Sequence, residues 1–306
     1  MRFIELGQKG NNKITSVFIT LSATIFVFFI VQVATLFIAI SLSNSQGISV
    51  DLNTTIDQIG ANTFLAIQLI PFAFALLTLV FCVKFIHKRS IRSLLTSREL
   101  IDWRRFLLSA LVWTVIMGIN LFFAFRFSDN IEWNFNLQSF LPLCLISLIL
   151  IPIQTTCEEV LFRGYLLQYF GSSYKKTWLA ILLSSILFGL VHAGNPEIDY
   201  LGYGALLYYI LTAIFLSLLT VMDEGLELSM GFHAANNIFG ALILTNDWQA
   251  FQTDAIFIDY SKPVFGVEMI LSLLLIQPLL LLLYARLYKW NNWKKKLFSP
   301  LNEAIS

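Results

Sequence analysis

Long apolar runs alternate with short polar segments along the whole chain of 306 residues. Eight of these runs are each long enough to cross about 30 Å of hydrocarbon as an α-helix. Helices are expected rather than open sheets, because lipid offers no hydrogen-bond partners to unpaired backbone groups. The pattern therefore predicts an all-α polytopic membrane helix bundle of about eight transmembrane helices. The predicted spans are residues 16–41, 63–83, 106–125, 137–157 (with an extension as far as 170 left open), 177–192, 203–222, 228–245 and 267–284.

The composition supports the same class of protein. Hydrophobic residues make up 57% of the chain, charged residues make up 13%, and the mean hydropathy is +0.74. A soluble domain carries about 25% charged residues, so this chain lacks the polar surface that water requires. The first apolar run is too long for a signal-peptide core and lacks a small-residue cleavage site. We therefore expect it to be retained as an anchor.

Lysine and arginine residues cluster in four segments of the chain. Seventeen of the 20 lie in the N-terminal region, the loop 84–105, the pair 175–176 and the tail 286–296. An even number of crossings places all four segments on one side, which is the cytoplasmic side by the positive-inside rule. The loops on the opposite side carry mostly acidic residues. We therefore expect an integral protein of a bacterial cytoplasmic membrane, with both termini in the cytoplasm.

Several reactive side chains have a simple interpretation. Cys82, Cys144 and Cys157 lie in apolar runs without the spacing of metal ligands, so we expect small buried side chains. His87 belongs to the basic loop, which we expect to lie against anionic lipid headgroups. We thus expect the protein to contact the lipid bilayer, and we expect no nucleic-acid partner.

The segment TTCEEVLFRG, residues 155–164, places three ionisable side chains at the end of an uncharged stretch. Such residues within a membrane span are costly, which makes them candidates for a function. Glu159 and Arg163 are four residues apart and share one helix face, so the spacing predicts an ion pair. Glu158 points about 100° away and lacks this partner, which makes it a candidate acid or base. The alternative interpretation is that all three charges form one packing network between helices.

Two of the three histidines also lie in apolar runs. His192 follows Phe188 by one helical turn, near the end of the fifth predicted span. His233 precedes Asn237 by one turn in the seventh predicted span. At 1.5 Å per residue, Glu158 lies roughly 18 Å and His192 roughly 24 Å from the cytoplasmic end of their helices, whereas His233 lies at roughly 9 Å. A single membrane histidine is usually a helix–helix hydrogen bond, but this set together favours a reaction site.

These segments resemble the three motifs of the CPBP family, the CAAX-protease and bacteriocin-processing intramembrane proteases that are also called the Abi family. EEVLFR at 158–163 resembles the motif E-E-x-x-x-R. Phe188 with His192 resembles F-x-x-x-H, and His233 with Asn237 resembles H-x-x-x-N. The motifs occur in the family's order, on separate predicted spans within residues 151–240. The resemblance implies a catalytic centre of Glu158, His192, His233 and Asn237, with structural support from Glu159, Arg163 and Phe188.

The resemblance also implies an activity and an organisation. Members of the family cleave peptide bonds within the membrane, in eukaryotes after the prenylated cysteine of CAAX proteins, with a cavity that faces the cytoplasm. Many bacterial members are instead linked to bacteriocin immunity or peptide processing, so the expected partner is a membrane-associated peptide or a CAAX-like protein. Residues 137–246 would form the catalytic core. Residues 1–136 would form peripheral helices and the basic loop, and residues 247–306 an external loop, the last span and the basic tail.

Two mechanisms fit the same residues. In the first, Glu158 and His192 deprotonate a water molecule, while His233 and Asn237 hold the developing oxyanion. In the second, Glu158, His192 and His233 bind zinc and leave one position open for water. The chain has no H-E-x-x-H motif. We favour the metal-free mechanism and keep zinc as the alternative cofactor.

Other functions are also compatible with the sequence. Cys157 could act as a nucleophile with a histidine, but the adjacent carboxylate of Glu158 disfavours a thiolate. A proton-coupled transporter would also use glutamate and histidine, although many such proteins have duplicated halves and this chain shows no repeat. A non-catalytic membrane scaffold would tolerate other polar residues at the histidine positions. The sequence determines neither the substrate nor the oligomeric state.

Overall fold

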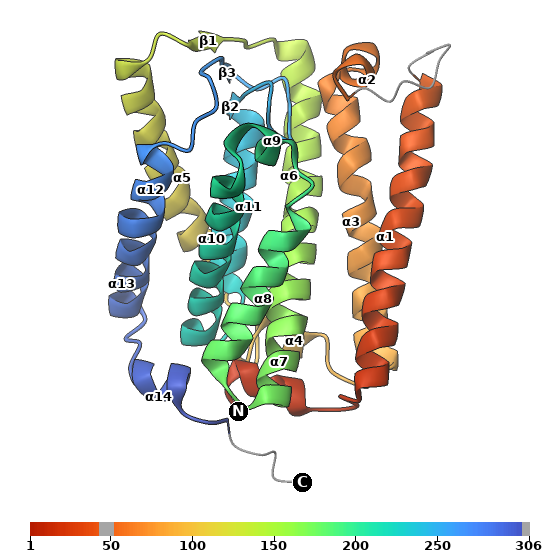
Figure 1. The fold of residues 1–306 in the computed structure, drawn as a ribbon, viewed down its shortest axis with the longest axis vertical. Helices are drawn as coiled ribbons and strands as arrows, with labels where there is room; N and C mark the ends of the chain where they lie inside the picture. The colour runs from red at the N-terminus through yellow and green to blue at the C-terminus, as the bar shows by residue number, and fades with distance from the viewer. Residues whose placement is uncertain (43–51, 302–306) are drawn as a thin grey trace.

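The computed structural model describes residues 1–42 and 52–301. Its long helices stand side by side and alternate in direction along the chain (Figure 1). Short helices, turns and a small sheet connect them at the two ends of the bundle. The long helices are α1 (Ile14–Leu42), α3 (Ala61–Phe85), α5 (Trp103–Phe127), α6 (Leu137–Glu159), α8 (Thr177–Val191), α10 (Tyr203–Asp223) and α11 (Glu227–Leu242), followed by the stretch that runs through α12 (Val267–Leu271) and α13 (Gln277–Leu287).

The predicted all-α membrane bundle is confirmed. Six of the described helical stretches are long and apolar enough to cross a membrane, and α8 is a shorter apolar helix. The seventh predicted span corresponds to α11, which is 16 residues long. The fourth and eighth spans are built from successive pieces. Leu137–Tyr174 consists of α6, the π-helical segment η2 (Val160–Leu166) and α7 (Leu167–Tyr174), whereas Val267–Leu287 consists of α12, η3 (Ser272–Ile276) and α13.

Local sequence explains how α6 begins and where its geometry changes. The side chain of Asn136 caps the helix by accepting a hydrogen bond from the backbone N–H of Gln138 at 2.9 Å. Pro142 and Pro152 lie inside the helix, where each removes one backbone donor. The π-helical segment begins directly after Glu159. Such insertions occur frequently at functional sites, and this one begins directly beside the adjacent residues Glu158 and Glu159.

The two ends of the bundle carry different elements. The helices η1 (Phe3–Gln8), α4 (Arg92–Leu95) and α14 (Trp293–Phe298) lie at the end where both ends of the described chain lie (Figure 1). The four basic segments are also at this end, which we call the basic end. The opposite end, which we call the outer end, holds α2 (Leu52–Ile59) and α9 (Pro196–Leu201). Residues 1 and 301, the two ends of the described chain, therefore lie on one side of the bundle, as the charge pattern predicted.

A three-stranded sheet covers part of the outer end and was not predicted. The central strand β3 (Phe257–Asp259) pairs antiparallel with β1 (Ile131–Trp133) and parallel with β2 (Leu244–Thr245). Strands of two or three residues are too short to show an alternating polar pattern, which explains why the sequence did not reveal them. Because β3 belongs to the external loop 246–263, this loop folds back over the bundle.

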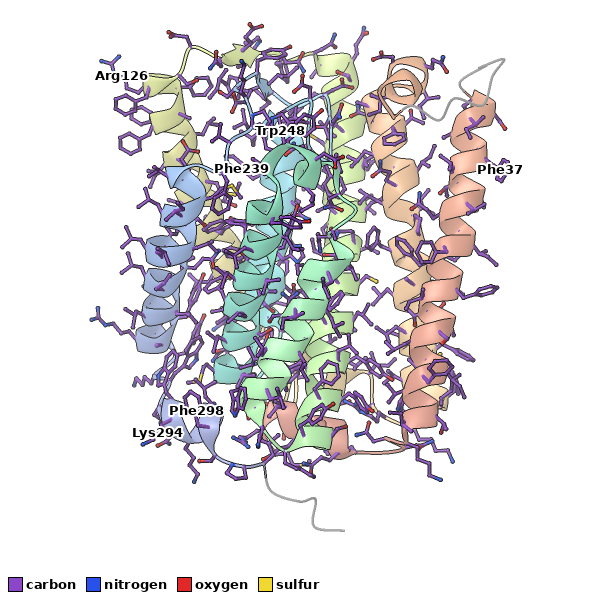
Figure 2. All side chains as sticks on the ribbon, viewed as in Figure 1. Phe37, Arg126, Phe239, Trp248, Lys294 and Phe298 are labelled. Carbon is purple, nitrogen blue, oxygen red and sulfur yellow. The ribbon has the colours of Figure 1, made fainter. Side chains whose placement is uncertain are left out.

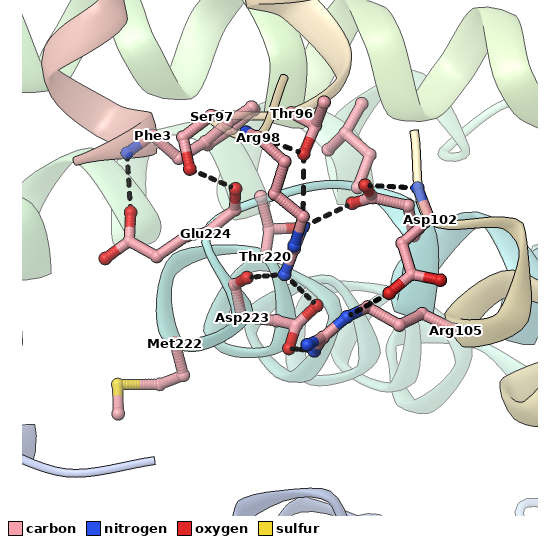
Figure 3. A network of polar contacts seen from close by, with 12 residues as sticks. Phe3, Thr96, Ser97, Arg98, Asp102, Arg105, Thr220, Met222, Asp223 and Glu224 are labelled. Atoms are coloured by element: carbon pink, nitrogen blue, oxygen red, sulfur yellow. Dashed lines mark hydrogen bonds and ion pairs between the residues drawn. The ribbon is translucent and has the colours of Figure 1, made fainter. Parts of the chain in front are cut away.

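Buried carboxylates pair with arginines at the basic end (Figure 3). Asp223 Oδ2 lies 2.9 Å from Arg98 Nη2, and Asp223 Oδ1 pairs with Arg105. Glu227 Oε2 lies 3.0 Å from Arg98 Nη1, and Glu227 Oε1 accepts the backbone N–H of Asp102 at 3.2 Å. The side chains of Asp223 and Glu227 are only 1% and 2% exposed. We call this group of residues the basic-end network, because it joins the basic loop to α10 and α11.

His87 is buried, so our expectation of a headgroup contact was wrong for this residue. Its residue surface is 1% exposed. Its Nε2 lies 3.0 Å from the Thr20 hydroxyl and 2.9 Å from the Tyr165 hydroxyl, while its Nδ1 lies 2.6 Å from the carbonyl oxygen of Asn11. The N-terminal segment and α1 thus cover this part of the basic loop. A local sequence pattern could not show that a segment 76 residues away supplies a partner.

The three cysteines are free thiols, as their spacing predicted. Cys82 and Cys157 are buried, whereas Cys144 is only half-buried. They therefore pack as small side chains and provide no cross-link between helices.

Candidate active site

The predicted ion pair between Glu159 and Arg163 is present and fully buried. Arg163 Nη1 lies 2.8 Å from Glu159 Oε1, and neither side chain is exposed. The guanidinium also lies over the ring of Phe188, with 4.3 Å between Arg163 Cζ and the ring centroid. Arg163 thus links η2 to both α6 and α8 through a charged pair and a cation–π contact.

Glu158 makes different contacts from its neighbour. Its Oε1 accepts a hydrogen bond from Gln154 Nε2 at 2.5 Å. Its Oε2 lies 3.6 Å from His233 Nε2, which is too long for a hydrogen bond, and has no hydrogen-bond partner among the described residues. Among the described residues, Arg163 forms its ion pair with Glu159 and not with Glu158, as the helical spacing predicted. Glu158 is nevertheless not isolated, because Gln154 holds one of its two oxygens.

His233 lies between the two glutamates. Its Nδ1 lies 2.9 Å from Glu159 Oε1. An ionised carboxylate only accepts hydrogen bonds, so Nδ1 carries the proton and Nε2 is directed toward Glu158. The depth expected from helix length was therefore too shallow for His233. The estimate counted residues from Glu227, whose side chain is buried because it pairs with Arg98, so the basic loop covers the start of α11.

His192 is oriented by the end of its own helix. It is the first residue after α8, and its Nδ1 lies 2.7 Å from the carbonyl oxygen of Phe188. A carbonyl can only accept, so Nδ1 carries the proton and the lone pair of Nε2 is left available. The ring stacks on Tyr209, with centroids 4.5 Å apart and an interplanar angle of 29°. Two contacts therefore hold the imidazole in one orientation and one tautomer.

Gln154 is a site residue that the sequence analysis missed. It donates to Glu158, and its Oε1 accepts a hydrogen bond from Asn237 Nδ2 at 3.1 Å. Asn237 Oδ1 in turn accepts from Asn236 Nδ2 at 3.1 Å, and Asn236 Oδ1 accepts from Trp113 Nε1 at 3.1 Å. This chain of amides fixes Asn237 relative to Glu158. A signal was present, because Gln154 is a polar residue one helical turn before Glu158 in an apolar span.

These side chains border one cavity of about 720 Å³. The volume falls within the range of about 300–1,000 Å³ that is typical of ligand sites. Glu158 and His192 lie on its wall without a direct hydrogen bond between them in the described part of the chain. The four residues of the predicted catalytic centre all line this cavity: Glu158, His192, His233 and Asn237.

The same side chains do not form a metal site in this structure. Within residues 1–42 and 52–301, no three histidine, cysteine, aspartate or glutamate side chains are grouped so that they could hold a metal ion. Glu158 is held by Gln154, and His233 is held by Glu159, so their arrangement is set by hydrogen bonds within the protein. These bonds leave Glu158 Oε2 and His233 Nε2 free, and it is the spacing of the described side chains, with no three close enough together, that does not fit the zinc alternative.

The region around the site is similar in sequence to known proteins. Residues 137–239 match the family described as Type II CAAX prenyl endopeptidase Rce1-like. An uncharacterized protein of Bacillus subtilis (strain 168), YyaK, is 33% identical over 176 residues, which cover 57% of this chain and 59% of the relative. The chain thus matches less than two thirds of the length of this relative. No solved structure matches.

The matched region contains every motif that the sequence analysis singled out. It begins with α6, includes α8 and α10, and ends within α11. The Rce1-like family is one of CAAX-type intramembrane endopeptidases. The apolar helices make this chain an integral membrane protein, and the Bacillus relative points to a bacterial cytoplasmic membrane. Residues 137–239, which contain all three motifs, match the Rce1-like family model, in agreement with the CPBP group that the motifs resemble.

Proposed function

We propose that this protein is an intramembrane endopeptidase in which Glu158 activates a water molecule. One observation carries the proposal: Glu158 Oε2 is an acceptor without a hydrogen-bond partner among the described residues, on the wall of the cavity. Buried polar groups are normally paired, so an unpaired carboxylate oxygen beside a cavity is suited to bind water or substrate. Gln154 holds the other oxygen, which aims the carboxylate.

The proposed reaction begins with a water molecule between Glu158 and the substrate carbonyl. Glu158 takes a proton as the water oxygen bonds to the carbonyl carbon, which forms a tetrahedral oxyanion. Asn237 has a second N–H that is not used by Gln154, and His233 donates from Nε2 when it is protonated. These two groups would stabilise the oxyanion. Glu158 then returns the proton to the departing amine as the C–N bond breaks.

His192 would assist through its available Nε2. A neutral imidazole with a free lone pair can accept a proton from water or hold the water by a hydrogen bond. The Phe188 carbonyl bonded to Nδ1 stabilises the tautomer that this role requires. The contact with Tyr209 keeps the ring against the cavity wall.

Glu159 and Arg163 would act as positioning residues. Glu159 accepts from both Arg163 and His233, so one buried carboxylate fixes the orientation of the imidazole. Phe188 lies against the guanidinium and, at 6.2 Å between ring centroids, near His233. We place this catalytic core in residues 137–246 and propose that residues 1–136 and 247–306 surround it. The last five residues of the chain lie outside the described part.

The proposal is tested with protein purified in detergent and a set of apolar peptides whose cleavage is followed by mass spectrometry. Glu158→Gln, His192→Ala and His233→Ala should each abolish cleavage, because each removes a group that touches the reacting atoms. Glu268→Gln is the matched control, since Glu268 is an exposed carboxylate at the start of α12. Full activity in any of the first three variants would remove that residue from the centre. Zinc at one per chain, with cleavage lost on chelation, would overturn the metal-free mechanism.

A further inference from the structure

Part of the cavity wall comes from α1 and α3, two helices that precede the region 137–239 matched by the family model. Gln32 of α1 and Gln68 of α3 bring their side-chain amides to this wall. The wall also includes the glutamate–histidine site, which consists of Glu158, His192, His233 and Asn237. One cavity thus joins the proposed reaction centre to two polar side chains that none of the three motifs includes.

Neither of these two glutamine side chains has a hydrogen-bond partner among the described residues. The Thr35 hydroxyl donates to the backbone carbonyl of Gln32 at 3.0 Å, a bond that leaves the side-chain amide unused. By contrast, the hydroxyl of Thr24 in the same wall donates to the carbonyl oxygen of Thr20 at 2.8 Å. A polar group without a partner inside a membrane span is costly, which makes these amides candidates for binding another molecule.

The packing of α1 against α3 places the two amides at one level. The helices are neighbours that run in opposite directions (Figure 1). The rings of Phe28 and Phe72 meet edge to face across them, with centroids 5.0 Å apart. Gln32 lies one turn after Phe28 along α1. Gln68 lies one turn before Phe72 along α3, so both amides are displaced from the aromatic contact in the same direction.

Gln32 lies on a different face of α1 from the side chains that contact lipid. Phe37 is 67% exposed and lies on the side of α1 that faces away from the other helices (Figure 2). Gln32 precedes Phe37 by five residues, which corresponds to about 140° around the helix. The amide of Gln32 is therefore turned toward the cavity, in agreement with its place in the wall.

The two amides lie within reach of a peptide that is bound at Glu158. Leu69, next to Gln68, belongs to one buried cluster with Ile151 of α6. Glu158 follows Ile151 by seven residues, which is roughly 10 Å along the helix. An extended peptide covers about 3.3 Å per residue, so roughly three of its residues would separate the amides from the carboxylate.

A peptide substrate needs hydrogen-bond partners of this kind. A peptide bond is accessible to water only where the chain is unwound, and unwinding frees backbone N–H and C=O groups. Lipid offers these groups no partners, so the protein has to supply them. The side chains of the glutamate–histidine site are assigned to the water and the oxyanion. A glutamine amide carries both a donor and an acceptor, which match the C=O and N–H of a peptide backbone.

We propose that Gln32 and Gln68 bind the main chain of the substrate, about three residues from the scissile bond. This inference rests on the proposed endopeptidase function and adds two substrate-binding residues that lie outside the family match. The substrate that fits is a membrane-associated peptide with an unwound segment next to its cleavage site. Recognition at this position depends on free backbone groups and not on a particular side chain.

Binding is measured separately from cleavage, in protein that carries Glu158→Gln and holds a peptide without cutting it. The probe is a fluorescent apolar peptide, and its anisotropy in detergent gives Kd. Gln32→Met and Gln68→Met remove the amides and keep an unbranched side chain of similar length. Val33→Met and Leu77→Met are matched controls on the same two helices, because these residues are 51% and 66% exposed and do not belong to the described lining of the cavity.

Each glutamine variant should raise Kd about threefold to tenfold, since each loses about one net hydrogen bond, and the controls should not change it. A second series of peptides has one ester in place of one peptide bond, which removes a single backbone N–H. An ester about three residues from the cleavage site should weaken binding by a similar factor. This ester effect should disappear in the double variant Gln32→Met with Gln68→Met.

The inference is overturned if both glutamine variants bind the peptide as tightly as the controls. It is also overturned if the ester effect is the same with and without the two glutamines, or if the Glu158→Gln protein binds no apolar peptide. The ester effect is a ratio within each protein, so a loss of stability in a variant does not imitate it. If the glutamines bind the main chain but the wild type cleaves no peptide, the proposed function fails while this binding site stands.

Discussion

Two networks of arginine and carboxylate lie in this bundle, and they differ in how completely they are hydrogen-bonded. In the basic-end network, both oxygens of Asp223 and both oxygens of Glu227 have a donor. In the glutamate–histidine site, Glu158 Oε2, Glu159 Oε2 and Arg163 Nε have no hydrogen-bond partner in the described part of the chain. The side chains of Asp223, Glu227 and Glu159 are at most 2% exposed, and that of Glu158 is 12% exposed.

The difference indicates what each network is for. A fully paired network has no remaining capacity to bind another molecule, so its contribution is to hold helices together. A partly paired network is costly for stability, and it persists in native proteins where the free groups are needed for chemistry. The same residue types therefore have a structural role at the basic end and a proposed catalytic role beside the cavity.

The largest expected effect is on stability at the ion pair beneath the site. Glu159→Ala and Arg163→Ala should each lower the free energy of unfolding by about 3–5 kcal/mol, because the remaining charge would be buried without its partner. Thermal unfolding in detergent measures this effect. Replacement of both residues, as Glu159→Leu with Arg163→Met, should recover much of the stability but not the cleavage activity. If Glu158→Gln unfolds the protein while Glu159→Ala only stops turnover, the two roles are exchanged.

The next largest effect concerns the amide that is proposed to hold the oxyanion. Asn237→Ala should lower kcat about 100-fold to 1,000-fold with little change in melting temperature. Gln154→Leu should lose part of the same activity, since Gln154 aims both Asn237 and Glu158. The control is Gln138→Leu, an exposed residue at the start of the same helix. An unchanged kcat in Asn237→Ala would exclude this residue from the oxyanion site.

A smaller loss of stability is expected at the basic-end network. Asp223→Asn should lower the free energy of unfolding by about 1–3 kcal/mol, because two arginines lose a charged partner while both remain partly exposed to solvent. Activity at a temperature where the variant is folded should be unaffected, in contrast to Glu158→Gln. Asp199→Asn, an exposed carboxylate in α9, is the comparison. Loss of cleavage in folded Asp223→Asn would show that the two networks are not separate in function.

The smallest effect is a pH dependence that arises at His87. Burial lowers the pKa of the His87 imidazole below its ordinary value of 6.5, against an opposing contribution from the Asn11 carbonyl. The unfolded chain therefore binds a proton more readily than the folded protein. The stability is complete above pH 6.5 and falls as the pH decreases, by at most about 1.4 kcal/mol per pH unit.

This contribution is isolated by comparing the wild type with His87→Asn between pH 8 and pH 5. The variant should be less stable at pH 8 but should lose less stability on acidification, as measured by thermal unfolding. Equal pH dependence in the two proteins would contradict a role for this imidazole.

Much of the fold followed from local patterns. The apolar runs predicted the helices because a span needs about 20 apolar residues whatever its neighbours are. The basic segments predicted that both termini share one side. The Glu159–Arg163 pair was also predictable, since a separation of four residues brings two side chains together on any helix.

The sequence by itself determined the class of protein, the order of its spans and one buried ion pair, because each of these depends on residues close together along the chain. Only the tertiary structure decided that His233 lies between two glutamates 74 and 75 positions earlier, that Gln154 bonds to Asn237, and that His87 is buried. These contacts depend on how far one helix is shifted and rotated against another. That offset is set by the packing of many side chains together, and no local periodicity records it.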